Sequence, residues 1–214
     1  MRISISKHIL LFGLFCLFTK GALSADRYWI ATGTANWDDI ANWSATSGGA
    51  GGASVPGASD VAIYDGIAGS NGNCNLDIAP TIAGLLVTGY SGTIVMNGND
   101  LTVSSTVNNT FSSGFITNSL GTTATFSLTT TAILTFSGTT FGVSTSFAPI
   151  VNCSGGQVYL NGSTFYGPTA LTKNGGTNNL GNGGMFFMGL PPYQIQEAVF
   201  SQQPLLHPIS FMQI

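Results

Sequence analysis

The residues of this chain that could perform acid–base chemistry are concentrated in its first half. Seven of the eight acidic residues lie there, and Glu197 is the eighth. The seven are Asp26, Asp38, Asp39, Asp60, Asp65, Asp77 and Asp100. Between Leu101 and Gly184 there is no Asp, Glu, His or Arg. General acid–base catalysis needs ionisable groups within hydrogen-bond reach of a substrate. The stretch 101–184 therefore cannot hold a carboxylate pair, a catalytic triad or a metal cluster. The sequence predicts that the protein is not an enzyme and has no catalytic residues.

Two short segments carry oxygen ligands that could bind calcium. Asn97-Gly98-Asn99-Asp100-Leu101 is faintly similar to a calcium-binding nonapeptide repeat, but it occurs once and lacks the preceding glycine pair. Asp38-Asp39 could bind calcium together with loop carbonyls. We favour a turn for the segment 97–101. For Asp38-Asp39 we favour a solvated turn or the N-cap of a very short helix. Phosphate-binding loops and zinc-ligand spacings are absent, so we expect no metal and no cofactor.

All three tryptophans, Trp29, Trp37 and Trp43, lie close together near the N-terminus. Exposed tryptophans in a secreted protein can stack on sugar rings, so these residues are candidates for a carbohydrate-binding module. The favoured reading is that they seal the first coil of a repeat fold, because that coil has no preceding coil to bury it.

Cys74 and Cys153 are the two cysteines outside the signal-like N-terminus. An exported chain permits a disulfide between them. The alternative is two small buried side chains, and both readings stay open because the sequence does not supply the Cα separation that a disulfide requires.

The first 25 residues have the features of a secretory signal peptide. Arg2 and Lys7 precede an apolar run from Ile9 to Phe18, and small residues follow at Ala22, Ser24 and Ala25. Cleavage after Ser24 or Ala25 fits this pattern, and we favour Ala25. The apolar run is shorter than the minimum of about 17 residues for a membrane span, and no other stretch is long enough. We therefore expect a secreted or cell-surface protein without a transmembrane segment in its mature form.

The amino-acid composition limits which partners the protein can bind and which fold class it can have. Without the signal peptide, Arg27 and Lys173 are the only basic side chains, against eight acidic residues. Such a surface cannot neutralise a run of phosphates, which excludes nucleic acid as a partner. Charged residues make up only 6% of the chain, glycine occurs 29 times, and hydrophobic residues make up 43%. This combination is typical of a packed β protein and not of a disordered one.

The elements that must position these residues are short strands. In the segment 82–103, apolar groups such as Leu85-Leu86-Val87 and Ile94-Val95-Met96 are each closed by Gly, Asn or Ser, and no helical stripe runs through them. The same pattern continues with Thr-Phe-Ser at 110–112, 125–127 and 135–137. We predict an all-β solenoid with a Trp-rich N-terminal cap over 26–68 and stacked coils over 69–184.

One ordered set of residues resembles the N-terminal part of large bacterial secreted β-strand-repeat proteins of the autotransporter-associated kind. It consists of Trp29, the two Asn-Trp phrases at 36–37 and 42–43, Pro56, Asp60, Ile63, Leu76-Asp77, Leu85 to Val87 and Leu101 to Val103. The resemblance covers about residues 27 to 184. It implies a right-handed parallel β-helix at the cell surface or outside the cell, and it implies no chemistry.

The composition changes at residue 185. The segment 185–214 contains four prolines, His207 and Glu197, and almost no glycine. It can be read as a docking segment or a disordered end. We favour a third reading, a frameshift that truncates a longer repeat protein: the codons read one base earlier permit a Gly/Thr/Ser/Asn-rich string. Its Phe-Tyr-Gly would follow Phe165-Tyr166-Gly167 at a spacing typical of solenoid repeats, about 20 to 29 residues.

Together these features predict a non-enzymatic, secreted or cell-surface structural protein of adhesin-like character, with surface glycans or other extracellular surfaces as partners. Two alternatives remain. One is a carbohydrate-binding module that uses Trp29, Trp37 or Trp43, and the other is an accessory region of a polysaccharide-degrading enzyme.

Overall fold

The chain forms three β-sheets that surround one shared interior. The computed structural model describes residues 24–104, 109–119, 122–129, 133–142, 150–153, 157–166, 171–173 and 186–188. Most of the predicted signal peptide, and the predicted tail from residue 189 onward, lie outside these residues.

Almost all regular structure in the described part consists of strands. Two short 3₁₀ helices, η2 (Ile40–Asn42) and η3 (Ile67–Gly69), interrupt them. The strands are β1 (Asp26–Trp29), β2 (Ala35–Asn36), β3 (Trp43–Ser44), β4 (Val61–Tyr64), β5 (Cys74–Asn75), β6 (Thr81–Ile82), β7 (Gly84–Val87), β8 (Thr93–Val95), β9 (Leu101–Val103), β10 (Asn109–Phe111), β11 (Phe115–Thr117), β12 (Thr125–Leu128), β13 (Ile133–Ser137), β14 (Thr140–Phe141), β15 (Ile150–Cys153), β16 (Gln157–Asn161), β17 (Thr164–Tyr166), β18 (Leu171–Lys173) and β19 (Phe186–Met188).

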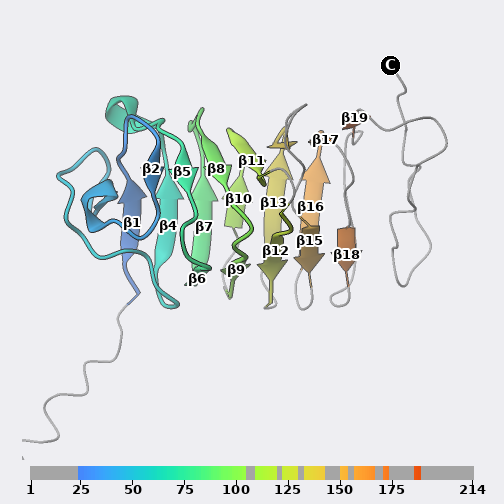
Figure 1. Ribbon diagram of the computed structural model, residues 1–214, viewed down its shortest axis with the longest axis horizontal. Helices are drawn as coiled ribbons and strands as arrows, with labels where there is room; N and C mark the ends of the chain where they lie inside the picture. The colour runs from blue at the N-terminus through green and yellow to red at the C-terminus, as the bar shows by residue number, and fades with distance from the viewer. Residues whose placement is uncertain are drawn as a thin grey trace, which may run out of the picture.

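From β4 to β18, each successive group of three strands adds one strand to every sheet. Sheet A has the order β16-β13-β10-β7-β4-β1-β3, sheet B has β19-β17-β14-β11-β8-β5-β2, and sheet C has β18-β15-β12-β9-β6. Every neighbouring pair is parallel except β1 and β3. Figure 1 shows the strands of sheet A side by side along the long axis. This arrangement is a β-solenoid, so the predicted all-β, stacked-strand fold is confirmed; we call one turn of it a coil.

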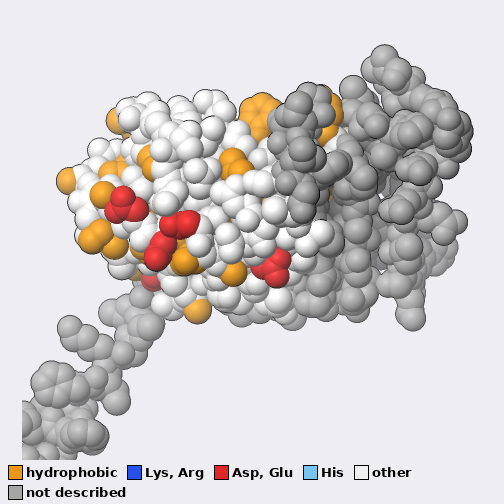
Figure 2. All heavy atoms as spheres, in the orientation of Figure 1, with side chains coloured by type: hydrophobic (Ala, Val, Ile, Leu, Met, Phe, Trp, Pro, Cys, Tyr) orange, Lys and Arg blue, Asp and Glu red, His pale blue; other side chains and the backbone are white. Residues whose placement is uncertain are grey.

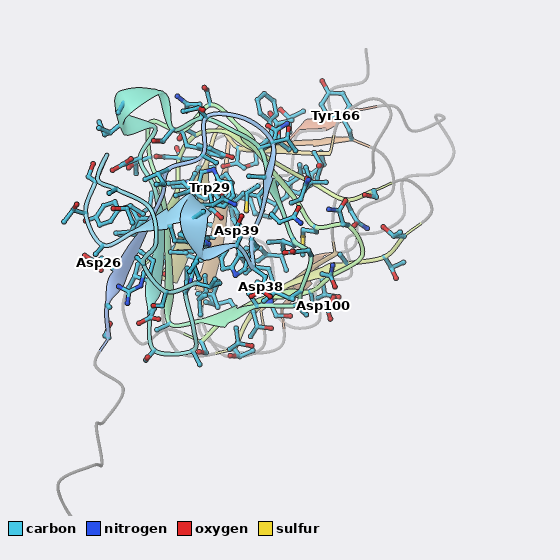
Figure 3. The ribbon with its side chains drawn as sticks, turned by 60° about the vertical axis from the view of Figure 1, so that its left-hand side comes forward. Asp26, Trp29, Asp38, Asp39, Asp100 and Tyr166 are labelled. Atoms are coloured by element: carbon cyan, nitrogen blue, oxygen red, sulfur yellow. The ribbon has the colours of Figure 1, made fainter. Side chains whose placement is uncertain are left out.

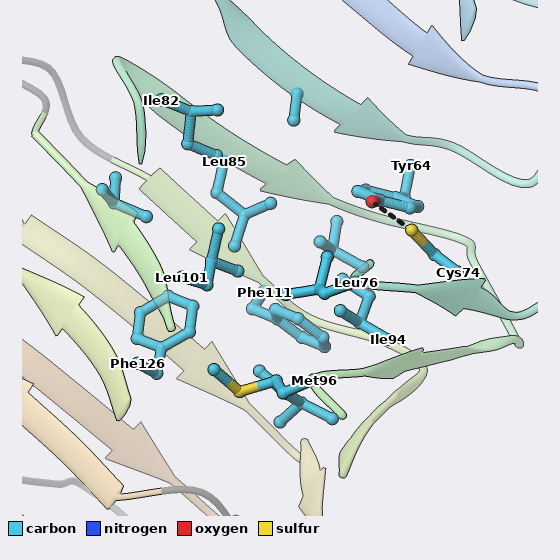
Figure 4. Close-up of a cluster of buried hydrophobic side chains, with 14 of the residues drawn as sticks. Tyr64, Cys74, Leu76, Ile82, Leu85, Ile94, Met96, Leu101, Phe111 and Phe126 are labelled. Atoms are coloured by element: carbon cyan, nitrogen blue, oxygen red, sulfur yellow. Dashed lines mark hydrogen bonds between the residues drawn. The ribbon is translucent and has the colours of Figure 1, made fainter. Parts of the chain in front are cut away.

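The alternation of side chains explains why these residues form strands with one buried face. In β12, Phe126 and Leu128 are buried while Thr125 and Ser127 are partly exposed, and β9 repeats the pattern with Leu101 and Val103. Successive side chains of a strand point to opposite faces. The apolar residues therefore enter the interior, where Figure 4 shows part of their cluster, and the Thr and Ser residues face outward.

Residues in register form continuous columns inside the solenoid. On sheet B, Cys74, Ile94, Ile116, Phe141 and Phe165 follow one another from coil to coil. The rings of Phe141 and Phe165 stack with centroids 4.5 Å apart and an interplanar angle of 10°. Because each coil buries its apolar side chains against the next, stability depends on contacts between neighbouring coils.

Asparagine side chains add hydrogen bonds between coils. Asn73 Oδ1 accepts from the Thr93 amide at 3.0 Å. Asn118 Oδ1 accepts from the Gly98 amide at 2.8 Å. In the interior, Asn109 is 1% exposed and its Oδ1 accepts from the Leu85 amide at 2.6 Å. These bonds satisfy backbone donors at places where the sheet ladder does not.

The N-terminal end differs from the stacked coils. β1 pairs in parallel with β4, and β3 pairs antiparallel on the other edge of β1. The loop beyond β3 returns along it, because the Ala53 amide donates to the Trp43 carbonyl at 3.0 Å. Parallel stacking thus begins at Asp26, inside the range 26–68 that the sequence analysis assigned to the cap.

The described part of the atypical tail continues sheet B. β19 pairs in parallel with β17, and Phe187 lies in register with Phe165. The frameshift hypothesis aligns the same two positions, since its alternative reading also has Phe at 187. The hypothesis itself concerns the gene and remains a prediction.

Candidate functional site

The aspartates are spread over the surface. In Figure 3, Asp26 lies apart from Asp38, Asp39 and Asp100. Within the described residues, no group of three or more His, Cys, Asp or Glu side chains could hold a metal ion. The face shown in Figure 2 carries a few separated carboxylates on a mostly uncharged background.

Most of these carboxylates accept hydrogen bonds from nearby backbone amides. Asp39 Oδ1 accepts from the Ala41 amide at 2.9 Å and forms the N-cap of η2, as one reading of the Asp38-Asp39 pair predicted. Asp77 Oδ1 accepts from the Asp38 amide at 3.0 Å, and Asp100 Oδ1 accepts from the Thr125 amide at 2.7 Å. These carboxylates stabilise turns and join coils.

The segment Asn97-Gly98-Asn99-Asp100 forms a turn, as predicted. Asn97 and Gly98 have φ values of 52° and 80°, and the Asn99 amide donates to the Met96 carbonyl at 2.8 Å. Only Gly adopts this left-handed conformation freely, and Asn tolerates it better than most residues.

The three tryptophans form one buried aromatic cluster with Tyr64. Trp43 makes edge-to-face contacts with Trp29 at 5.2 Å and with Trp37 at 4.8 Å between ring centroids. Trp43 and Tyr64 lie 5.8 Å apart. Trp43 Nε1 donates to the Trp37 carbonyl at 2.8 Å, whereas Trp37 Nε1 is buried without a hydrogen-bond partner.

This geometry corrects the hypothesis that Trp29, Trp37 and Trp43 stack on glycans. The side chains of all three are 0% exposed. A ring without an accessible face cannot stack on a sugar, so these residues are not a glycan-binding site in this structure.

A second buried cluster, which the sequence analysis missed, links three coils through one carbonyl group. Gly72 O, in the coil of β4 and β5, accepts from Trp29 Nε1 at 2.9 Å and from the Tyr90 hydroxyl at 2.7 Å. Trp29 belongs to the preceding coil and Tyr90 to the following one. A carbonyl oxygen has two lone pairs, so both bonds can form at once.

Tyr64 packs against the two rings that bind this carbonyl, with centroids 5.8 Å from Trp29 and 5.0 Å from Tyr90. The Tyr64 hydroxyl donates to Cys74 Sγ at 3.3 Å (Figure 4). Burial raises the pKa of Tyr64 well above its usual range, and the neighbouring Cys74 and Tyr90 raise it further. Burial likewise raises the pKa values of Cys74 and Tyr90. Cys74 therefore stays a neutral thiol near pH 7, which makes it a poor nucleophile and a poor metal ligand.

The suggested Cys74–Cys153 disulfide is also corrected. Cys74 is a free, buried thiol. It lies on β5 of sheet B, whereas Cys153 lies on β15 of sheet C, three coils further on. Strands are spaced about 4.8 Å apart, which puts the two residues about 14 Å apart along the axis. A disulfide requires Cα atoms within about 7 Å.

Comparison with protein-family models, with curated proteins and with solved structures finds no match for this chain. Among the described residues, no helix is long and apolar enough to cross a membrane.

Proposed function

We propose that this chain is a non-enzymatic structural protein, secreted or displayed at the cell surface, whose solenoid serves as a stiff adhesin-like support. The observation that carries the proposal is the register of the sheets: inward columns of apolar side chains continue from Trp29 to Phe165 through parallel pairing in each coil. Such stacking gives an extended body whose length grows with the number of coils.

The use of the polar groups supports a structural role. The Asp39, Asp77 and Asp100 carboxylates accept hydrogen bonds from backbone amides. The buried Tyr64, Cys74 and Tyr90 are neutral near pH 7, and burial raises their pKa values further above that pH. The outward positions of the strands are occupied mainly by Thr, Ser and Asn, which suit a hydrated surface.

Further parts of the proposal come from the sequence. The signal-like segment 1–25 supports export, and the resemblance to bacterial β-strand-repeat proteins supports a right-handed coil and display outside the cell. The burial of the three tryptophans at the first coil, behind β3 and its returning loop, supports their role as a cap.

An adhesion assay tests this function. Beads coated with the full chain are layered on bacterial and host cell surfaces, and both bead retention under flow and release of soluble sugars are measured. Retention above that of albumin-coated beads, without sugar release, is the expected result. Sugar release by the purified protein would show an enzyme, and the absence of retention on every surface would remove the adhesive role.

A further inference from the structure

The outer face of sheet B carries an unusual side chain. Phe115 is 38% exposed, and it is the one aromatic side chain exposed to this extent among the residues whose burial the structure describes. It lies on β11, where Ile116 is buried, so the alternation of the strand places the Phe115 ring on the solvent side.

Threonine hydroxyls flank this ring along the axis. Phe115 lies in register with Thr93 on one side and Thr140 on the other, and Thr140 is followed by Thr164. Thr93, Thr140 and Thr164 are all partly exposed. The phenyl ring is therefore set in a row of hydroxyl groups spaced by about 4.8 Å, the distance between neighbouring strands.

A second partly exposed ring lies further along the same face. Tyr166 is two residues beyond Thr164 in β17, and the buried Phe165 lies between them, so Tyr166 faces the same side as Thr164. In Figure 3 its phenol projects from the surface. Phe115 and Tyr166 are two strand steps apart, about 10 Å along the axis. Tyr166 lies two residues further along its strand than Thr164, which is in register with Phe115 through Thr140, so the two rings lie diagonally on this face.

We propose that this face, formed by Phe115, Thr140, Thr164 and Tyr166 and called the sheet B platform, binds a neutral glycan chain lying along the solenoid axis. A sugar ring has an apolar C–H face that packs on an aromatic ring and hydroxyl groups at its rim. The Phe115 ring takes the apolar face, and the Thr140 and Thr164 hydroxyls exchange hydrogen bonds with the rim.

The charges of these residues favour a neutral glycan over a nucleic acid. None of the four platform residues is Asp, Glu, Lys, Arg or His, and the chain carries a formal net charge of −3. A nucleic acid could also stack on aromatic rings, but it needs a cationic groove for its phosphates. A protein partner favours a continuous apolar centre, whereas here hydroxyl groups separate the two rings.

The proposal deepens the adhesive role proposed above and rests on it, because it names the surface and the partner of the adhesion. The full chain is titrated by calorimetry with neutral hexasaccharides of glucose, mannose, xylose and galactose, and with oligogalacturonate and single-stranded DNA as charged probes. We expect binding to at least one neutral hexasaccharide and none to the charged probes. No binding to any neutral probe, or preferred binding to a charged one, would overturn the proposal.

Phe115→Thr is the decisive variant, since it extends the threonine row and keeps a residue suited to a strand. Loss of the ring should weaken glycan binding by about tenfold. Ile78→Thr is the matched control, because Ile78 is also 38% exposed but lies outside the platform; its affinity should match wild type. Equal affinity of Phe115→Thr and wild type would contradict the proposal. Tyr166→Thr repeats the test if Phe115→Thr does not fold.

The bead assay separates this proposal from the broader function. Beads that adhere equally with wild type and Phe115→Thr would refute the sheet B platform and leave the adhesive role in place. Glycan binding that depends on Phe115, without bead retention, would refute the adhesive role and leave the platform.

Discussion

The three buried tryptophans at the N-terminal end differ in whether their indole N–H groups donate a hydrogen bond. Trp29 donates to Gly72 O at 2.9 Å, and Trp43 donates to the Trp37 carbonyl, but the Trp37 indole nitrogen is buried without a partner. A buried donor without an acceptor costs free energy, whereas a satisfied one contributes to stability. The three tryptophans are therefore equally buried but energetically different.

The Trp→Phe substitutions test this difference. Trp29→Phe and Trp37→Phe remove similar volume, but only Trp29→Phe removes a hydrogen bond. Trp29→Phe should lower the free energy of unfolding by about 1 to 2 kcal/mol more than Trp37→Phe. Urea unfolding followed by circular dichroism measures both variants. Equal losses would mean that the bond to Gly72 O contributes nothing to stability.

The buried Tyr64, Cys74 and Tyr90 should make the protein less stable at alkaline pH. Burial raises their pKa values in the folded state, whereas in the unfolded chain Cys ionises near about 8.5 and Tyr near about 10. Above these values the unfolded state releases protons that the folded state retains. The free energy of unfolding therefore keeps its full value below about pH 8.5. Above that pH it falls, by up to about 1.4 kcal/mol per pH unit for each group.

Tyr64→Phe removes one of these groups. Its unfolding free energy should be lower than that of wild type at pH 7, because the bond to Cys74 is lost, but should fall less steeply above about pH 10. Denaturant unfolding at pH values from 7 to 11 measures the slopes. Parallel curves for the two proteins would exclude a contribution of Tyr64 to the alkaline loss.

At the scale of elements, the corners between sheets A and B let the coils approach closely. Gly33 and Gly72 lie at this corner in successive coils, and the Gly72 amide donates to the Ala31 carbonyl at 2.9 Å. A Cβ atom at Gly72 would overlap the backbone of Gly33, but a Cβ atom at Gly33 would meet no atom within 4 Å. The corner thus has no room for a side chain at Gly72, whereas it has room for one at Gly33.

This asymmetry predicts opposite results for two alanine substitutions. Gly72→Ala should destabilise the protein by about 3 kcal/mol, because the neighbouring backbone must move and the carbonyl that binds Trp29 and Tyr90 moves with it. Gly33→Ala should change stability by less than about 1 kcal/mol. Thermal unfolding of both variants is the measurement, and similar melting temperatures would show that the corner has room for a methyl group.

At the scale of the molecule, the solenoid has an N-terminal end that is covered by the chain itself. β3 occupies the outer edge of β1, and the Arg27 side chain donates from Nε to Ser54 Oγ at 2.8 Å, which ties the returning loop to β1. Unpaired strand edges promote association between molecules, and short covering segments prevent it.

Substituting Trp43 tests this protection. Trp43→Gly removes the ring contacts that hold β3 in place and should increase concentration-dependent association, as measured by light scattering. Ile40→Ser is the control, because Ile40 lies in the adjacent η2 but is 56% exposed. If Trp43→Gly associates no more than Ile40→Ser and remains folded, β3 does not protect the end of the solenoid.

Stacked strands, threonine-rich outer faces and the Asn97-Gly98 turn could be predicted from the sequence, because side-chain alternation and the backbone preferences of Gly and Asn act over a few residues. The tertiary structure alone decided which residues meet. Loop lengths differ from coil to coil, and the register they produce brings Trp29, Gly72 and Tyr90 together, joins Tyr64 to Cys74, and keeps Cys74 away from Cys153. Tertiary packing also buries the tryptophans proposed as a sugar site and leaves Phe115 exposed, because burial depends on what the neighbouring coil and the returning loop cover.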